Sequence, residues 1–121
     1  MEILEMLKIA ANALNEKKAK MLSAIEIADL TMLCEYFLIC TATSSTHVRA
    51  LCEEVEAKLE EAGIRPHHIE GKSTGWVALD YGSLIVHIFT PADREFYSLD
   101  RMWSDGKPID LDEILVNTQG D

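Results

Sequence analysis

The segment from residue 75 to residue 89 constrains the fold more than any other part of the chain. Its two halves are rich in β-branched and aromatic residues, which predicts two adjacent β-strands joined by a tight turn. Gly82 supplies the positive φ that a short hairpin turn requires. We expect Tyr81 and Gly82 to form the loop of this hairpin. Trp76 would then lie opposite His87 on the neighbouring strand.

Alternation along the two predicted strands gives the hairpin one apolar face and one mixed face. The apolar face carries Val77, Leu79, Leu84, Val86 and Ile88. The mixed face carries Trp76, Ala78, Asp80, Ile85, His87 and Phe89. A strand pair that is apolar on nearly both sides is typical of the centre of a sheet with helices packed on it.

Helical and extended segments alternate along the whole chain. Apolar residues at helical spacing predict helices over residues 2–17 and 45–62, and Thr90-Pro91 is a typical start for a third helix. Strands are expected at residues 23–28, 36–42, 67–70 and in the hairpin. This order predicts an α/β fold, a single layered domain with a mixed β-sheet flanked by helices.

The C-terminal third of the sequence predicts a helix followed by an acidic tail. Phe96, Leu99 and Trp103 are spaced so that they face one way. We expect residues 1–106 to form the domain. Residues 107–121 would be an acidic tail that docks as a short turn or frays.

The charge balance limits the classes of partner. The chain has 11 Lys and Arg residues against 21 Asp and Glu residues, which gives a net charge of −10. A surface this acidic repels a phosphate backbone, so we expect no direct binding of nucleic acid. A basic protein surface is a better match, and the alternative is that the charge only maintains solubility.

The cysteines and the N-terminal segment predict a cytoplasmic protein. Cys34, Cys40 and Cys52 are scattered among apolar residues, which is typical of reduced, buried thiols. No apolar run approaches the ~20 residues that a membrane span needs. Glu2 and Glu5 are unlike the basic start of a secretory signal, so we expect no export and no membrane insertion.

The polar motifs do not form a recognisable catalytic set. Thr43–His47 follow a predicted buried strand, where a helix N-terminus can bind phosphate, but helix capping also explains these residues. His67, His68 and Glu70 suggest a metal site, although adjacent strand residues point to opposite faces. Asp80 is a single carboxylate at a strand end, whereas metal-dependent nucleotidyl transfer needs a pair. Glu70 would be a second only if the fold brought it close to Asp80, which the sequence does not decide. We therefore expect no catalytic residue, no metal and no cofactor.

Trp76 is the main candidate for a binding residue. A Trp in a core contributes packing, and its truncation costs ~3–5 kcal/mol of stability. A Trp on a half-covered face beside acidic groups has the composition of an interface anchor, where truncation costs at least ~2 kcal/mol of binding. The sequence leaves both roles open. His87, on the same face, is expected to pack against Trp76 rather than to act as a general base.

Several runs of residues in a fixed order are similar to those of a known family. They are Glu35–Thr41, Thr43–Ala50, Glu70–Gly71, Trp76–Gly82, Val86–Phe89, Arg94, Tyr97–Asp100 and Met102–Trp103. Together they resemble the ribosomal silencing factor family, also called the Iojap family, over about Glu2 to Trp103. Glu35 replaces the usual Asp of the family, and Ala42 replaces its usual Gly.

The resemblance implies a nucleotidyltransferase-like α/β fold without demonstrated catalysis, and it implies a ribosomal partner. The expected partner is the large ribosomal subunit through ribosomal protein L14, at the face that joins the small subunit. A factor bound there blocks subunit joining and represses translation when nutrients are short. The expected contact residues are Trp76, Asp80, Tyr81 and Gly82, with Glu70 as a further acidic contact.

Two other functions remain open at this level. The first is a nucleotide-binding or nucleotidyltransferase-like enzyme, which rests on fold analogy alone. The second is a homodimer formed through the Trp76 face, which would compete with ribosome binding. The missing second carboxylate separates the silencing factor from the enzyme.

Overall fold

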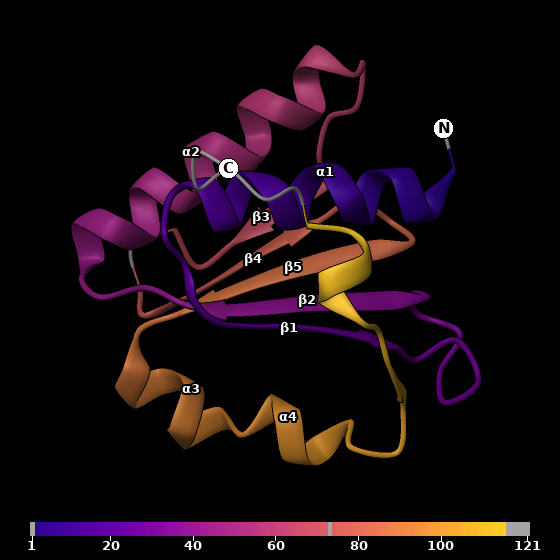
Figure 1. Cartoon of the computed structure of the whole chain (residues 1–121). Coiled ribbons are helices and arrows are strands. Elements are labelled where there is room, and N and C mark those ends of the chain that lie inside the picture. Colours follow the sequence, from indigo (N-terminus) through magenta and orange to yellow (C-terminus); the bar gives the residue numbers. More distant parts are fainter. Residues whose placement is uncertain (1, 73, 116–121) are drawn as a thin grey trace.

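The computed structural model describes residues 2–72 and 74–115, and in them the chain forms a six-stranded sheet with helices on both faces (Figure 1). The elements are α1 Ile3–Glu16, β1 Lys20–Glu26, β2 Tyr36–Thr41, α2 Ser45–Glu61, β3 His68–Glu70, β4 Trp76–Asp80, β5 Leu84–Phe89, α3 Pro91–Tyr97, α4 Leu99–Met102, β6 Lys107–Pro108 and a 3₁₀ turn, η1, Leu111–Glu113. The strand order is β3-β4-β5-β2-β1-β6. The predicted mixed α/β sheet is confirmed.

The centre of the sheet is a parallel pair. Tyr36 of β2 lies level with Leu84 of β5, and Thr41 lies level with Phe89 at the other end. Because β2 is covered on both faces, its apolar run has no polar alternation. The strand that directly follows α2 is β3, and it lies at the edge of the sheet rather than beside β2.

The predicted β4–β5 hairpin is present, but its predicted register is wrong by two residues. Trp76 lies opposite Phe89 rather than opposite His87. The loop is Gly82-Ser83, because the Asp80 side chain accepts a hydrogen bond from the Gly82 backbone N–H at 2.8 Å and moves the turn one position along. A shift of two residues keeps every side chain on its predicted face.

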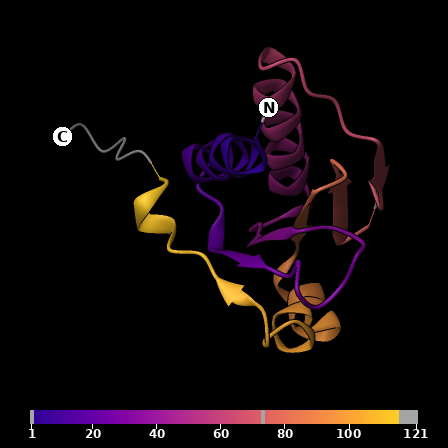
Figure 2. The same ribbon diagram turned by 90° about the vertical axis from the view of Figure 1, so that its right-hand side faces the viewer.

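Helices α1 and α2 cover one face of the sheet, as Figure 2 shows. The apolar hairpin face packs beneath them, in a core whose fully buried members include Leu7, Leu14, Leu51, Val55, Leu59, Leu79, Leu84 and Ile88. Gly63 ends the second helix region with a φ of +83°, which agrees with its predicted role as the C-terminal stop.

His47 connects the two helices of this layer. Its backbone N–H donates to the Ser44 side chain at 3.1 Å, which confirms helix capping in the predicted segment. Its ring Nδ1 accepts from the Thr43 backbone N–H at 2.9 Å. The proton therefore sits on Nε2, which donates to the Lys17 carbonyl oxygen at 2.7 Å, just beyond the end of α1.

The opposite face is partly covered by α3 and α4, which are separated by a break that the sequence did not predict. Ser98 has a left-handed φ of +51°, so the chain turns between the two short helices. Leu99 is buried and Trp103 is half-buried, whereas Phe96 is 78% exposed. The prediction that Phe96 shares a face with Leu99 and Trp103 is therefore wrong, because it assumed an unbroken helix.

The chain then returns to the sheet edge beside β1. Lys107 pairs with Glu26, and Ile109, Leu111 and Ile114 pack against the core beneath α1. The described part of the predicted tail, residues 107–115, thus contacts the domain. A separate tail unit beginning at residue 107 stays a prediction, and residues 116–121 lie outside the described residues.

Candidate partner-binding face

The sheet face opposite α1 and α2 is only partly covered. Leu99 of α4 lies over this face in a buried cluster with Phe37 and Phe89. The side chains toward the β3 edge are less covered. We call this region the open strip; it consists of His68, Glu70, Trp76, Ala78, Asp80 and Ile85, which are half-buried or exposed. The pairing of Glu70 with Ala78 and of His68 with Asp80 places all of them on one face.

Trp76 combines the two roles that the sequence left open. Its indole is half-buried, with its ring centre 5.1 Å from that of Phe89 and 4.5 Å from that of Tyr97. Its Nε1–H donates to His87 Nδ1 at 3.1 Å. The ring is thus fixed by packing and by a hydrogen bond, while part of it remains in contact with solvent.

His87 lies beneath Trp76 as a neutral side chain. Its Nδ1 accepts the proton of the indole N–H, so its own proton sits on Nε2, which has no hydrogen-bond partner among the described residues. Burial lowers the pKa of His87 to about 4. Phe37 contacts the imidazole edge-on, with ring centres 4.5 Å apart. These contacts are those of a packing residue, as the sequence predicted.

The aromatic surface continues from Trp76 onto α3. Tyr97 is exposed beside Trp76, and the Phe96 ring lies edge-on against Tyr97 with ring centres 5.0 Å apart. Neither residue was predicted to lie on the contact surface. The only local signal was the Phe96-Tyr97 doublet itself, and its exposure depends on the break at Ser98.

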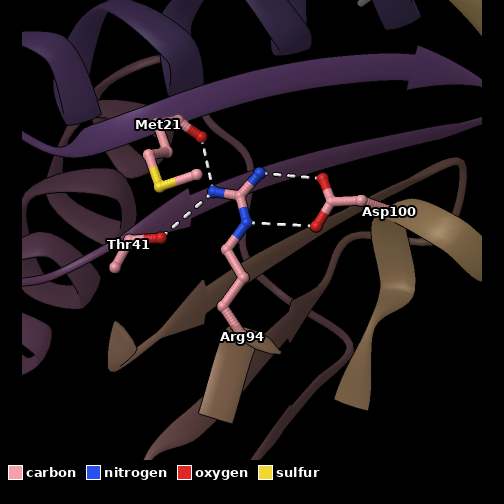
Figure 3. A network of polar contacts seen from close by, with 4 residues as sticks. All are labelled: Met21, Thr41, Arg94 and Asp100. Carbon is pink, nitrogen blue, oxygen red and sulfur yellow. Dashed lines mark hydrogen bonds and ion pairs between the residues drawn. The ribbon is translucent and has the colours of Figure 1, made fainter. Parts of the chain in front are cut away.

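Arg94 fixes α3 in position against the sheet (Figure 3). It is buried, and its Nε and Nη2 donate to the two carboxylate oxygens of Asp100 at 3.1 and 2.8 Å. Its Nη1 donates to the Met21 carbonyl oxygen and to the Thr41 hydroxyl. The hydrogen bonds from Arg94 lower the pKa of Asp100. One side chain thereby joins β1, β2, α3 and α4, and so sets where Tyr97 meets Trp76.

The turn after β4 separates three of the predicted contact residues. Asp80 and Gly82 lie at the end of the open strip, and Gly82 has a φ of +87°. A side chain at Gly82 would have its Cβ 3.0 Å from Cε1 of His67, so a larger residue would need the imidazole to move. Tyr81 points to the other face, where it is 4% exposed, and burial raises its pKa. Its side chain is thus not available at the strip.

The whole sequence matches one protein family. The model of the family described as ribosomal silencing factor during starvation matches residues 1–121. The chain belongs to the ribosomal silencing factor family. The sequence resemblance to this family marked Trp76, Asp80, Tyr81 and Gly82 for partner contact. Of these residues, Trp76 and Asp80 lie on the open strip.

Individual relatives cover most of the chain. The ribosomal silencing factor of Bacillus subtilis strain 168 is 36% identical over 107 residues, which are 88% of this chain and 91% of that protein. A crystal structure of a Chromobacterium violaceum protein superposes with a TM-score of 0.83 at 35% identity, covering 86% of this chain and 88% of that one. A mouse protein named for mitochondrial assembly of the ribosomal large subunit is 28% identical over 95 residues, 75% of this chain and 42% of that protein.

The other sequence candidates are not brought together. Within residues 2–72 and 74–115, no three His, Cys, Asp or Glu side chains gather where they could hold a metal ion. Cys34, Cys40 and Cys52 are free and buried, as predicted. No helix in the part of the chain that the structure describes is long and apolar enough to cross a membrane.

Proposed function

We propose that this protein is a ribosomal silencing factor that binds ribosomal protein L14 on the large subunit, at the face that joins the small subunit. Bound there, it blocks subunit joining and represses translation when nutrients are limiting. Membership of the family supports the proposal, and the observation that carries it is the half-exposed, fixed indole of Trp76 on the open strip.

The open strip has the composition of a surface for a basic protein. Trp76 is already held by Phe89 and Tyr97, so little side-chain entropy is lost when a partner covers it. Glu70 and Asp80 place carboxylates on the same face. Such charges orient a basic partner and speed its docking more than they add affinity. We therefore assign affinity to the aromatic cluster and orientation to the two carboxylates.

Steric exclusion requires no chemistry from the protein. A folded chain of this length has a radius of gyration of about 14 Å, and it occupies any joining surface on which it docks. Silencing then depends only on how tightly the open strip binds and where. We accordingly propose a binding protein that has no enzymatic activity, whose contact residues are Glu70, Trp76, Asp80 and Gly82, extended by Phe96 and Tyr97.

The proposal is tested by sedimentation with purified ribosomal subunits. We expect the protein to travel with the large subunit only and to reduce the yield of joined ribosomes. Phe96→Asp should lose both effects, because it introduces a charge at an exposed position beside Tyr97, whose ring packs on Trp76. Leu4→Asp is the matched control, since Leu4 is also exposed but lies on α1, across the sheet.

Two further measurements make the test decisive. Trp76→Phe retains a ring to pack on Phe89 but removes the indole, and circular dichroism verifies that the variant is folded. Binding of isolated ribosomal protein L14 to the wild type, and its loss in the folded variant, would agree with the proposal. A wild-type protein that ignores both subunits would overturn it.

A further inference from the structure

Two large apolar side chains are exposed to solvent at the tip of the loop between β1 and β2. Met32 is fully exposed, and its neighbour Leu33 is 83% exposed. We call these two residues the loop tip. Single exposed apolar residues are common on soluble proteins, but an adjacent pair on one projection is typical of a contact surface. Nothing in the partner surface described above uses them.

The loop that carries them is closed by its own hydrogen bonds. The Ile27 N–H donates to the Glu35 carbonyl oxygen at 2.8 Å, which joins the two ends of the loop. The Leu33 N–H donates to the Thr31 side chain at 3.1 Å, which shapes the tip. Ile27 and Cys34 are buried and fix the base of the loop. A partner that covers the tip therefore orders little additional backbone.

The loop is attached to the turn at the end of the open strip. Both the Glu35 and the Tyr36 N–H groups donate to the Ser83 carbonyl oxygen, at 2.9 and 3.0 Å. Between the loop and the turn lies a hollow of about 460 Å³, lined by Met32, Leu33, Gly82 and Ser83 among others. The loop tip, the hollow and the Asp80 turn thus form one continuous surface.

The base of this surface is acidic. Burial is the main cause that raises the pKa of the Cys34 thiol to about 11, and the nearby carboxylates of Asp80 and Glu35 contribute in the same direction. Asp29, at the other side of the loop, is paired with Lys107 at 3.2 Å, so the acidic character comes from Glu35 and Asp80. An apolar tip above carboxylates complements an apolar hollow bordered by Lys and Arg, rather than an acidic or a phosphate surface.

We propose that Met32 and Leu33 form a second anchor for the same basic ribosomal protein that the open strip binds. This inference rests on the proposed function. Trp76 and Asp80 are separated by roughly 13 Å along β4, and the loop tip lies beyond Asp80. A contact at Trp76 alone would leave the protein free to pivot, whereas contacts at both ends fix its orientation on the subunit. Met is flexible, so it can fit a hollow of irregular shape.

The test measures the affinity of wild type and two double variants for purified large subunits. Met32→Ser with Leu33→Ser should raise Kd at least about tenfold, as expected for loss of an anchor. Leu4→Ser with Met102→Ser is the matched control, because it removes one Leu and one Met that are also exposed, on α1 and at the end of α4. The control should bind as wild type does, and both double variants should melt at the wild-type temperature.

The outcomes separate this inference from the proposed function. If wild type does not bind large subunits, both are overturned. If wild type binds and the loop-tip variant binds within about twofold of it, only the second anchor is overturned. If the loop-tip variant dissociates a homodimer but still binds subunits normally, the tip serves a second copy of the chain and the inference fails. Met32→Leu, which retains an apolar side chain, should keep most of the wild-type affinity.

Discussion

The two faces of the sheet are built on different principles. The face beneath α1 and α2 contains apolar side chains that are almost completely buried. The face beneath α3 and α4 combines aromatic rings with His87 and Arg94, two buried polar side chains, and leaves Trp76 half-exposed. Apolar burial is non-directional and supplies stability, whereas the second face depends on directed hydrogen bonds that hold side chains in defined positions.

This difference assigns most of the stability to the first face and the proposed partner recognition to the second. The core residues of the first face are almost completely buried, so they can be altered only at the expense of folding. On the second face, less apolar surface is buried. Trp76 and Tyr97 remain partly exposed to solvent there, in positions fixed by packing. Substitutions on the first face should therefore mainly lower the free energy of unfolding. Substitutions on the second face should mainly change the positions of the side chains.

The largest expected effect is a cavity under α1 and α2. Leu79→Ala should lower the free energy of unfolding by about 2–5 kcal/mol, because Leu79 is fully buried between the sheet and the helices. Ile85→Ala, on the half-covered face, should cost clearly less. Urea unfolding followed by circular dichroism measures both. Equal losses would show that the two faces contribute alike, and the comparison would fail.

The second effect is the acid sensitivity of the half-covered face. His87 binds its proton with a pKa of about 4 when folded and near 6.5 when unfolded, so the unfolded state takes up more protons between these values. The free energy of unfolding should fall by about 3 kcal/mol as the pH falls from 6.5 to 4. In the His87→Gln variant, the free energy of unfolding should lose this dependence on pH. His67→Gln should retain it, because the His67 side chain is exposed.

A smaller loss is expected for Arg94→Met. The variant removes the hydrogen bonds to Asp100, Met21 and Thr41, and about 2 kcal/mol of stability should be lost, because the half-exposed Asp100 regains water. The pKa of Asp100 should return upward toward its ordinary value. Trp76 fluorescence in a Trp103→Phe background should also change as Tyr97 moves. An unchanged emission would show that Arg94 does not position the aromatic cluster.

The smallest effect on stability is expected at Phe96. Phe96→Ala should change the free energy of unfolding by less than about 0.5 kcal/mol, because the ring is mostly in water. Binding to the large subunit should nevertheless weaken. A thermal melt combined with sedimentation distinguishes the two quantities, and a large loss of stability would place Phe96 with the packing residues instead.

Local periodicity was sufficient to predict most of the architecture. Alternation assigned Trp76 and Asp80 to one face and Leu79 to the other, and the structure has them there. Alternation also predicted that Glu70 lies on a short strand. It did not predict that this strand pairs with β4. The Ser44 cap and the Gly63 stop of α2 were likewise local signals.

Two features of the fold could not be predicted from periodicity, one decided by a turn hydrogen bond and one decided by distant contacts. A two-residue register shift leaves both hairpin faces unchanged, so only the Asp80 hydrogen bond to Gly82 distinguishes the alternatives. The break at Ser98 lies between Arg94 and Asp100, residues whose pairing also engages β1 and β2. For that reason the Phe96-Tyr97 doublet alone was not sufficient to predict that these two side chains are exposed.

The parallel pairing of β2 with β5 has a consequence for how the protein is made. About 50 residues separate Tyr36 from its neighbour Leu84, and a ribosome adds roughly 5–20 residues per second, so β2 waits on the order of several seconds for its partner. During that interval the most apolar strand of the chain has only β1 to pair with. Folding should therefore be slow and late, which exposes the nascent chain to chaperones before it becomes able to act on other ribosomes.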